Sequence, residues 1–239
     1  LTKIMTLFIV FDELNKNNID LNDKIVFSKK ATQQQPSKLN IPQGKSITVD
    51  QAIDALIIKS ANDVAIAIAE KISGSEKAFV KKMNLFAKKI GLKNTNFANP
   101  HGLPNKSNLS SANDIFILSS ELIKQYPEYL KRFKRKKVTI NGKTYKTHNT
   151  LLNKHDYYIG LKTGYIRKSG FQISLLSKIN DNYLLGVYFG GNSAKERNNK
   201  IHFLMNKYKN MKSINKNIYK SNNSSNDYIV ETFLFQKDK

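Results

Sequence analysis

The hydrophobic period changes once along the chain, and this change constrains the fold more than any other feature. Before residue 126, apolar residues recur every three or four positions, which is typical of amphipathic or fully buried helices. After residue 156, three segments of strand length follow one another, at 157–162, 171–178 and 183–189. Helices first and antiparallel strands last predict an α+β fold, with an antiparallel sheet packed against a helical subdomain.

Short sequence signals locate the expected elements more closely. Thr48 with Gln51 and Ser73 with Glu76 form capping-box patterns, and Asn141-Gly142 suits a type I′ hairpin turn. Helices are expected over residues 2–15, 48–58, 62–72, 73–90, 110–126 and 193–208. A hairpin is expected over 138–145, loops over 31–45 and 92–109, and extended pieces over 24–30 and 228–235.

The chain is strongly basic, with 40 Lys and Arg against 18 Asp and Glu in 239 residues, a formal net charge of +22. Such a charge attracts anionic partners, but the basic residues are spread along the chain and no groove-reading motif accompanies them. We therefore do not expect nucleic-acid binding. Residues 1–209 are expected to form the folded domain, and the Asn-, Ser- and Lys-rich residues 210–239 a polar linker or tail.

Several residue types and segments are absent from the sequence. Without Cys, the chain has no disulfide, thiolate nucleophile or Cys-ligated zinc, and its four His residues show no ligand spacing. We expect these His residues to be structural or exposed. No apolar run is long enough to cross a membrane, and no signal peptide is present. Since the chain begins at Leu1 and not at Met, we expect it to be a fragment or a processed product.

Lys3 stands at the start of an apolar helix pattern that continues through Ile4–Phe11. Lys is rarely buried without a partner, and burial lowers the pKa of an amine toward the range of a catalytic base. In a Ser-x-x-Lys helix the two side chains share one face, and the Ser of such a pair would come directly before Leu1. Taken alone, Lys3 fits an ordinary Lys near a helix start better than a catalytic base.

Ser60-Ala61-Asn62 lies between two helix patterns that are apolar around most of their circumference. Buried polar groups there need hydrogen-bond partners, and a catalytic cleft is one way to supply them. The alternative is that Ser60 is merely the N-cap of the second helix. A near copy, Ser111-Ala112-Asn113, follows a polar loop and fits a helix start, so we favour the first copy for a site.

Lys162-Thr163-Gly164 ends or interrupts the first expected strand. Lys162 and Thr163 can hold a carboxylate, and Gly164 would let a ligand approach the backbone closely. A lone Lys-Thr-Gly occurs often by chance. Placed after a lysine helix and a Ser-x-Asn motif, and before two strands and a helix, it becomes a strong indication of serine acyl transfer.

With these motifs in this order, the chain resembles the S11-type serine peptidases, the D-alanyl-D-alanine carboxypeptidases among the low-molecular-mass penicillin-binding proteins. The resemblance covers about residues 1–208. Its motifs are Leu1-Thr2-Lys3-Ile4-Met5-Thr6, Ser60-Ala61-Asn62-Asp63, Gly91-Leu92-Lys93-Asn94-Thr95, His101-Gly102-Leu103, Asn149-Thr150-Leu151-Leu152 and Gly160-Leu161-Lys162-Thr163-Gly164-Tyr165. The resemblance implies a penicillin-binding, transpeptidase-like fold of the β-lactamase type, whose first strands are missing from these residues.

The resemblance also implies catalytic roles. Lys3 would be the base that activates the Ser before Leu1. Ser60 and Asn62 would relay protons and hold the substrate amide. These 239 residues would lack the nucleophile, so by themselves they would be inactive.

The resemblance implies a second group of residues that binds substrate. Lys162, Thr163 and Arg197 would bind the terminal carboxylate of a peptidoglycan stem peptide that ends in D-Ala-D-Ala, beside Gly164. The backbone N–H of Tyr165 would supply one oxyanion donor. No metal or organic cofactor is implied, and β-lactams would be inhibitors. The location would be periplasmic or otherwise extracytoplasmic, with no membrane anchor in this chain.

Two related alternatives remain open at this point. A class A β-lactamase shares the fold but needs a Glu on a loop, and the one candidate, Glu128, has surroundings that match poorly. A non-catalytic peptidoglycan-binding relative would keep the cleft without the nucleophile.

Overall fold

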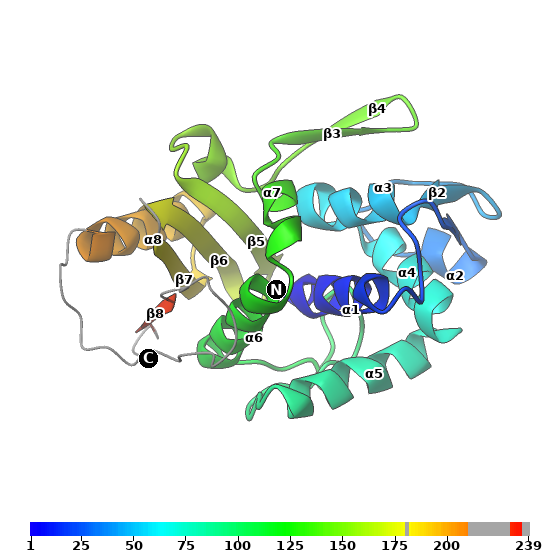
Figure 1. The fold of residues 1–239 in the computed structure, drawn as a ribbon, viewed down its shortest axis with the longest axis horizontal. Coiled ribbons are helices and arrows are strands. Elements are labelled where there is room, and N and C mark those ends of the chain that lie inside the picture. The colour runs from blue at the N-terminus through cyan, green and yellow to red at the C-terminus, as the bar shows by residue number, and fades with distance from the viewer. Residues whose placement is uncertain (180–181, 210–229, 236–239) are drawn as a thin grey trace. The chain divides into compact units, whose positions relative to one another are not determined.

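The computed structural model describes residues 1–179, 182–209 and 230–235, and the chain divides into two compact units (Figure 1). The helical unit consists of Thr2–Ser110 and Arg135–His148. The sheet unit consists of Leu1, Ser111–Lys134 and the chain from Asn149 onward. Each unit is built from different secondary structure, so each is described by itself.

The helical unit surrounds helix α1, Lys3–Asn15, which packs against α4 and α5 (Figure 1). Every residue from Lys3 to Phe11 is buried, and α1 contacts α4, α5 and the loop that carries Pro100 and His101. The other helices of this unit are α2 (Lys29–Thr32), α3 (Val49–Asp54), the π-helix η1 (Ala55–Lys59), α4 (Asn62–Ser73) and α5 (Glu76–Lys89). Its strands form two antiparallel pairs, β1 (Lys24–Val26) with β2 (Ser46–Thr48) and β3 (Lys137–Ile140) with β4 (Lys143–Lys146).

Local signals account for most element ends in the helical unit. The predicted capping box at Thr48 is present, since Thr48 Oγ1 accepts from Gln51 N at 3.1 Å and Gln51 Oε1 accepts from Thr48 N at 3.0 Å. Asn141 and Gly142 have φ of 48° and 74°, as the predicted type I′ turn requires.

Three predictions for this unit are wrong in detail. The capping box predicted at Ser73 does not form, because Ser75 caps α5 by accepting from Ala78 N at 3.2 Å. The extended piece predicted over 24–30 ends at Val26, because Ser28 caps the short helix α2. The helix predicted over 48–58 changes from α to π at Ala55.

The sheet unit contains one sheet with the strand order β5-β6-β7-β8. Its strands are β5 (Tyr158–Ile166), β6 (Gly170–Ile179), β7 (Asn182–Gly191) and β8 (Val230–Phe235). The first three strands are antiparallel, as predicted, whereas β8 pairs with β7 in parallel. Residues 180–181 and, within the predicted linker or tail over 210–239, residues 210–229 and 236–239 lie outside the described residues.

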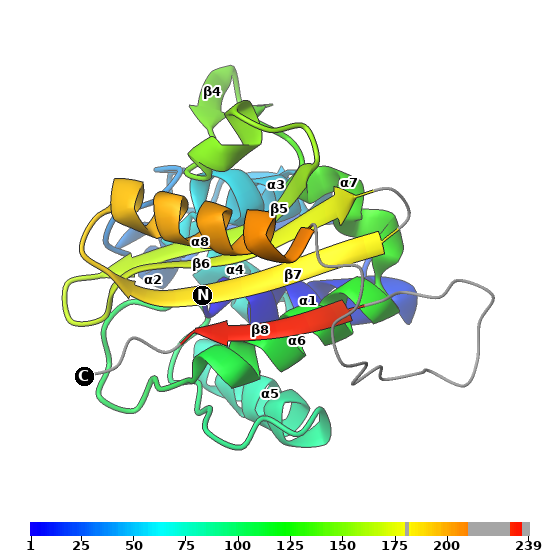
Figure 2. The ribbon, with the colours of Figure 1, turned by 90° about the vertical axis from the view of Figure 1, so that its left-hand side faces the viewer.

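Two helices cover opposite faces of this sheet (Figure 2). Ser119 of α6 (Ala112–Gln125) hydrogen-bonds Ser174 of β6 at 2.9 Å, so α6 lies on the Ser174 face. Ile201 and Met205 of α8 (Ala194–Lys209) lie against Gly186, on the face opposite Ser174. Shorter helices complete the unit, namely η2 (Pro127–Tyr129), α7 (Leu130–Phe133) and η3 (Thr150–Asn153). The core beneath α8 comprises Leu151, Leu152, Tyr158, Ile173, Leu175, Leu184, Tyr188, Ile201 and Met205.

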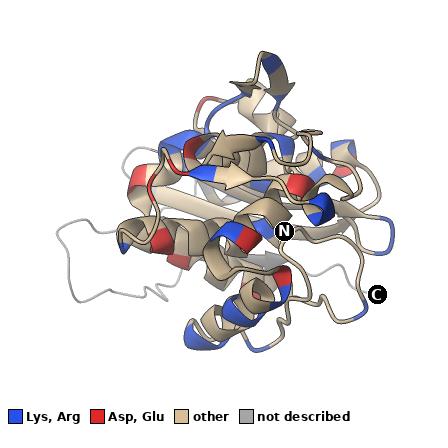
Figure 3. Ribbon diagram, turned by 90° about the vertical axis from the view of Figure 1, so that its right-hand side faces the viewer, with Lys and Arg blue, Asp and Glu red and all other residues tan. Residues whose placement is uncertain are grey.

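The charged residues follow no single element, since Lys and Arg occur on helices, strands and loops alike (Figure 3). Within the ranges 1–179, 182–209 and 230–235, no helix is both long enough and apolar enough to cross a membrane.

Candidate active site

The first group of candidate residues lies in the helical unit, around the ammonium of Lys3. Lys3 opens α1 and is only 4% exposed. Its Nζ donates to Asn62 Oδ1 at 2.7 Å and to the carbonyl of His101 at 2.7 Å. The structure therefore brings together Lys3 and Asn62, which are 59 positions apart in the sequence and were both predicted as site residues.

Asn62 is oriented by its other hydrogen bonds. Its Nδ2 donates to the carbonyl of Gln35 at 2.9 Å, and its backbone N–H donates to the carbonyl of Ser37 at 2.7 Å. Because the amide nitrogen is committed to Gln35, the amide oxygen faces Lys3. Asn62 thus has a fixed acceptor side and can position an amine beside it.

Ser60 has an unusual backbone conformation at the end of η1. Its φ of 58° and ψ of 38° lie in the left-handed region, which costs free energy for any residue but Gly. The N-cap of α4 is Ala61, so the alternative role of Ser60 as that cap is wrong. A π-helix followed by a left-handed Ser is the kind of strained turn that occurs at functional sites.

The second Ser-Ala-Asn copy has the structural role expected of it. Ser111 caps α6, and its hydroxyl accepts from Asp114 N at 3.1 Å. This capping bond accounts for the motif without a site.

Sequence reasoning missed two residues that organise this group. Asp63 is fully buried, and its carboxylate accepts from the backbone N–H groups of Leu39, Asn40 and Val64 at 2.9 to 3.1 Å. Burial raises the pKa of Asp63, although these bonds favour the ionised form. His101 supplies the carbonyl beside Lys3, and the motif His101-Gly102-Leu103 gave no sign of that contact.

The second group of candidate residues lies in the sheet unit, around Lys162 of β5 and Arg197 of α8. Both are buried, at 2% and 3% exposure. Burial and the neighbouring charge of Arg197 lower the pKa of Lys162 to about 7, and burial lowers the pKa of Arg197 to about 10. Two buried basic groups, one of which makes the other's charge less favourable, create a place where an anion is stabilised.

Hydrogen bonds hold both cations in position. Lys162 Nζ donates to the carbonyl of Thr163 at 2.9 Å. Arg197 donates to Asn198 Oδ1 from Nε at 3.1 Å and from Nη2 at 2.8 Å, and Asn198 Nδ2 donates to Thr150 Oγ1 at 2.8 Å. Asn198 is a positioning residue that the sequence gave no reason to single out.

The remaining predicted residues continue along β5. Thr163 and Gly164 pair with Ile173 and Gln172 of β6. A Cβ at Gly164 would lie 3.2 Å from the backbone nitrogen of Leu1 and 3.3 Å from Gln172 Oε1, so a side chain here would press against these two groups. The ring of Tyr165 is 58% exposed and lies 4.3 Å from that of Phe171.

Glu128, the candidate acid for the β-lactamase alternative, lies exposed on η2. An exposed carboxylate is screened by solvent, so nothing in this position adapts it to drive deacylation.

A comparison of the sequence with models of known protein families identifies a family for this chain. Residues 1–193 match the model of peptidase S11, D-alanyl-D-alanine carboxypeptidase. The chain belongs to this family. The membership confirms the resemblance found in the sequence.

Two similar relatives are both named D-alanyl-D-alanine carboxypeptidase. The chain is 35% identical over 210 residues to the D-alanyl-D-alanine carboxypeptidase DacF of Bacillus subtilis. This match covers 84% of the chain and 53% of DacF. It is 33% identical over 204 residues to DacD of Escherichia coli. This match covers 82% of the chain and 53% of DacD. The chain thus spans about half the length of these relatives. The matches do not favour the β-lactamase alternative.

Solved structures show the same fold. Penicillin-binding protein 5 of Haemophilus influenzae superposes with a TM-score of 0.81 at 30% identity, covering 85% of this chain and 61% of that one. Penicillin-binding protein D2 of Listeria monocytogenes, solved in an ampicillin-bound form, superposes with a TM-score of 0.76 at 27% identity, covering 86% of this chain and 84% of that one. The predicted α+β, transpeptidase-like fold is therefore confirmed.

Proposed function

We propose that the full-length protein is a serine-type D-Ala-D-Ala carboxypeptidase that removes the terminal D-alanine of peptidoglycan stem peptides through an acyl-enzyme. The observation that carries this proposal is the buried cation pair of Lys162 and Arg197, which suits a carboxylate. Thr163 adds a hydroxyl to this group, and Gly164 follows it on β5. A substrate carboxylate restores the favoured charge on Lys162, so binding selects peptides with a free C-terminus.

Lys3 and Asn62 are proposed to carry the proton transfers together with Ser60. Lys3 accepts the proton of the Ser hydroxyl as the Ser oxygen attacks the carbonyl carbon of the penultimate D-Ala. The C–N bond then breaks, and the proton passes to the leaving amine of the terminal D-Ala. The N–H of Tyr165 donates to the oxyanion, and water hydrolyses the acyl-enzyme.

The remaining expectations are part of the same proposal. The resemblance puts the acylated Ser directly before Leu1, so every experiment uses the full-length protein. β-Lactams acylate this Ser, and the enzyme acts outside the cytoplasm on the cell wall. Residues 1–209 carry the catalytic domain, and residues 210–239 are its tail, which also contributes β8.

Covalent labelling with a fluorescent penicillin tests the function. We expect the unchanged protein to retain the label after denaturation and to release D-Ala from a stem pentapeptide. Lys3→Ala should acylate slower by roughly a hundredfold or more, because the base is lost. Lys16→Ala, which removes an exposed Lys directly after the same helix, is the matched control and should label normally. Normal labelling of the Lys3 variant would reject the assigned base, and an unlabelled wild-type protein would reject the function.

A further inference from the structure

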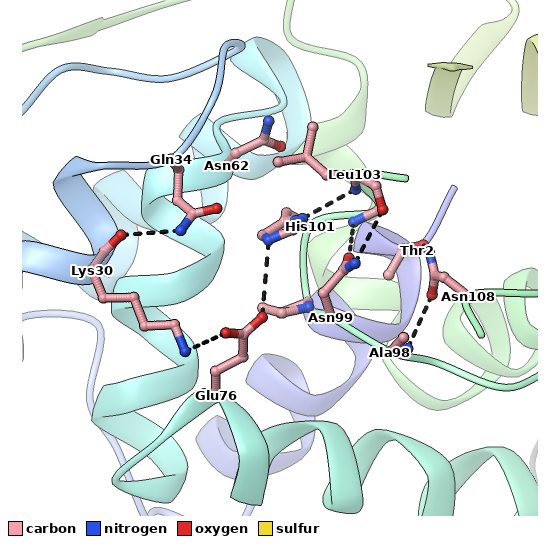
Figure 4. Close-up of polar contacts among 12 residues, drawn as sticks. Thr2, Lys30, Gln34, Asn62, Glu76, Ala98, Asn99, His101, Leu103 and Asn108 are labelled. Atoms are coloured by element: carbon pink, nitrogen blue, oxygen red, sulfur yellow. Dashed lines mark hydrogen bonds and ion pairs between the residues drawn. The ribbon is translucent and has the colours of Figure 1, made fainter. Parts of the chain in front are cut away.

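The carbonyl that holds Lys3 belongs to a loop, and internal hydrogen bonds shape that loop (Figure 4). Asn99 Oδ1 accepts from Gly102 N at 2.6 Å, and Asn99 Nδ2 donates to the carbonyl of Leu103 at 3.0 Å. Gly102 has a φ of 85°, and a Cβ there would lie 3.0 Å from Thr2 Oγ1. The loop is therefore closely packed. A small change in the backbone dihedral angles at His101 would move its carbonyl, which is the acceptor of Lys3.

The ring of His101 has a single hydrogen-bonding arrangement. Its Nδ1 accepts from Leu103 N at 3.1 Å, and a backbone N–H can only donate, so Nδ1 carries no proton. Burial, followed by the charges of Lys3 and Lys30, lowers the pKa of His101 to about 3. The ring is therefore neutral at neutral pH, with its proton on Nε2.

A carboxylate faces this proton. Glu76, the first residue of α5, has Oε1 4.0 Å from His101 Nε2, and its Oε2 lies 2.5 Å from Lys30 Nζ (Figure 4). The side chains of His101 and Glu76 are 7% and 18% exposed, whereas that of Lys30 is 56% exposed. A continuous series of polar groups thus runs from the surface at Lys30, through Glu76 and His101, to Lys3.

We propose that Glu76 is a positioning residue for Lys3 and acts through the ring and the main-chain carbonyl of His101. The inference rests on the proposed role of Lys3 as the base. The carboxylate attracts the Nε2–H dipole and fixes the rotation of the ring, and Lys30 fixes the carboxylate from its other side. With the ring fixed, the turn from His101 to Leu103 is fixed as well, and its carbonyl stays on Lys3 Nζ.

Two substitutions of His101 separate the two functions of the ring. Asn places an oxygen where Nδ1 lies, so His101→Asn keeps an acceptor for Leu103 N but loses the group that faces Glu76. Gln places an amide nitrogen near the position of Nε2, so His101→Gln keeps the donor to Glu76 and loses the turn. Glu76→Gln keeps a polar oxygen that faces Nε2 and loses the charge that binds Lys30.

The acylation rate constant of the full-length protein, measured over a range of penicillin concentrations, tests the proposal. We expect Glu76→Ala and His101→Asn each to lower the saturating rate constant roughly tenfold or more, with little change in the half-saturating concentration. The double variant should be no slower than the slower single variant, because both changes break one connection. Glu76→Gln should recover part of the lost rate.

Glu13→Ala is the matched control, because Glu13 also pairs with a Lys, at 2.7 Å from Lys82 Nζ, and lies on the helix of Lys3. It should lower stability without slowing acylation. Unchanged rates in both the Glu76 and His101 variants, or multiplied losses in the double variant, would overturn the positioning role alone. Failure of the unchanged protein to be acylated would instead overturn the proposed function and this inference with it.

Discussion

Lys3 and Lys162 are both buried, but their surroundings favour different tasks. Lys3 contacts the amide oxygen of Asn62 and the carbonyl of His101, which are neutral acceptors with fixed positions. Lys162 lies beside the guanidinium of Arg197, and the charge of Arg197 makes the charged form of Lys162 less favourable. The first environment holds an amine in place, and the second makes an amine receptive to an incoming anion.

Arg197→Gln tests the anion site at the scale of single residues. Loss of the guanidinium should lower kcat/KM for a stem peptide with a free carboxylate by roughly a hundredfold. The kcat/KM for the matching C-terminal carboxamide should change little, because that peptide has no charge to bind. Steady-state kinetics on both peptides measure the two values. Arg167→Gln, at an exposed position in the same unit, is the control. An equal loss on both peptides would contradict carboxylate binding by Arg197.

Among the elements, the succession of α3, η1 and α4 carries the Ser60-Ala61-Asn62 turn. The capping box fixes where α3 begins, the π-helix shifts the backbone register, and Ser60 ends it in the left-handed region. Asp63 then ties the start of α4 to the backbone of Leu39 and Asn40. The turn is thus fixed from both sides, as a site that orients Asn62 requires.

Thr48→Ala should weaken this succession at its first residue. The substitution removes the acceptor for Gln51 N, so the free energy of unfolding should fall by about 1 kcal/mol. Urea unfolding measures the change. Thr48→Ser keeps the hydroxyl and should restore most of the stability. A Thr48→Ala variant as stable as the unchanged protein would show that the box contributes nothing.

Sequence patterns predicted most of the helices and strands because their signals are local. The apolar period, the Thr48 cap and the Asn141-Gly142 turn each lie within a few residues. The π-helix and the left-handed Ser60 could not be predicted, because packing imposes them against local preference. The parallel pairing of β8 likewise depends on a partner distant in the chain.

The same distinction holds for the site. Lys3, Asn62 and Lys162 were predicted as site residues from motifs whose residue types and order are specific. Glu76 was singled out only as part of a capping box, and its contact with His101 joins residues 25 positions apart without any repeated spacing. Contacts of that kind follow from the fold and leave no pattern in the sequence.

At the scale of the whole molecule, the chain passes between the two units several times. Each unit contains a buried titratable group whose pKa is lowered. His101 belongs to the helical unit and Lys162 to the sheet unit. Both are held more favourably in the neutral form than in the unfolded chain, because burial disfavours their charge.

These two groups give stability two pH windows. The pKa of Lys162 falls from 10.5 to about 7 on folding, so its contribution is complete above 10.5 and is lost as the pH falls toward 7. The pKa of His101 falls from 6.5 to about 3, so its contribution is lost between those values.

Urea unfolding as a function of pH checks both windows. Lys162→Met should flatten the dependence between pH 7 and 10, and His101→Asn should flatten it between pH 4 and 6. Each variant should leave the other window in place, because neither group is among the causes of the other's pKa shift. Parallel curves for a variant and the unchanged protein would mean that the substituted group is not responsible for its window.

The β3–β4 hairpin has a consequence for the protein in crowded solution. It is a sheet of only two strands, and Lys137, Lys143 and Lys146 are exposed along it. Lys137 lies directly opposite Lys146, so repulsion between their like charges destabilises the hairpin. A second molecule adding a strand at this edge would bring further ammonium groups against these. The lysines thus oppose edge-to-edge aggregation of the hairpin, although their repulsion lowers the stability of the hairpin itself.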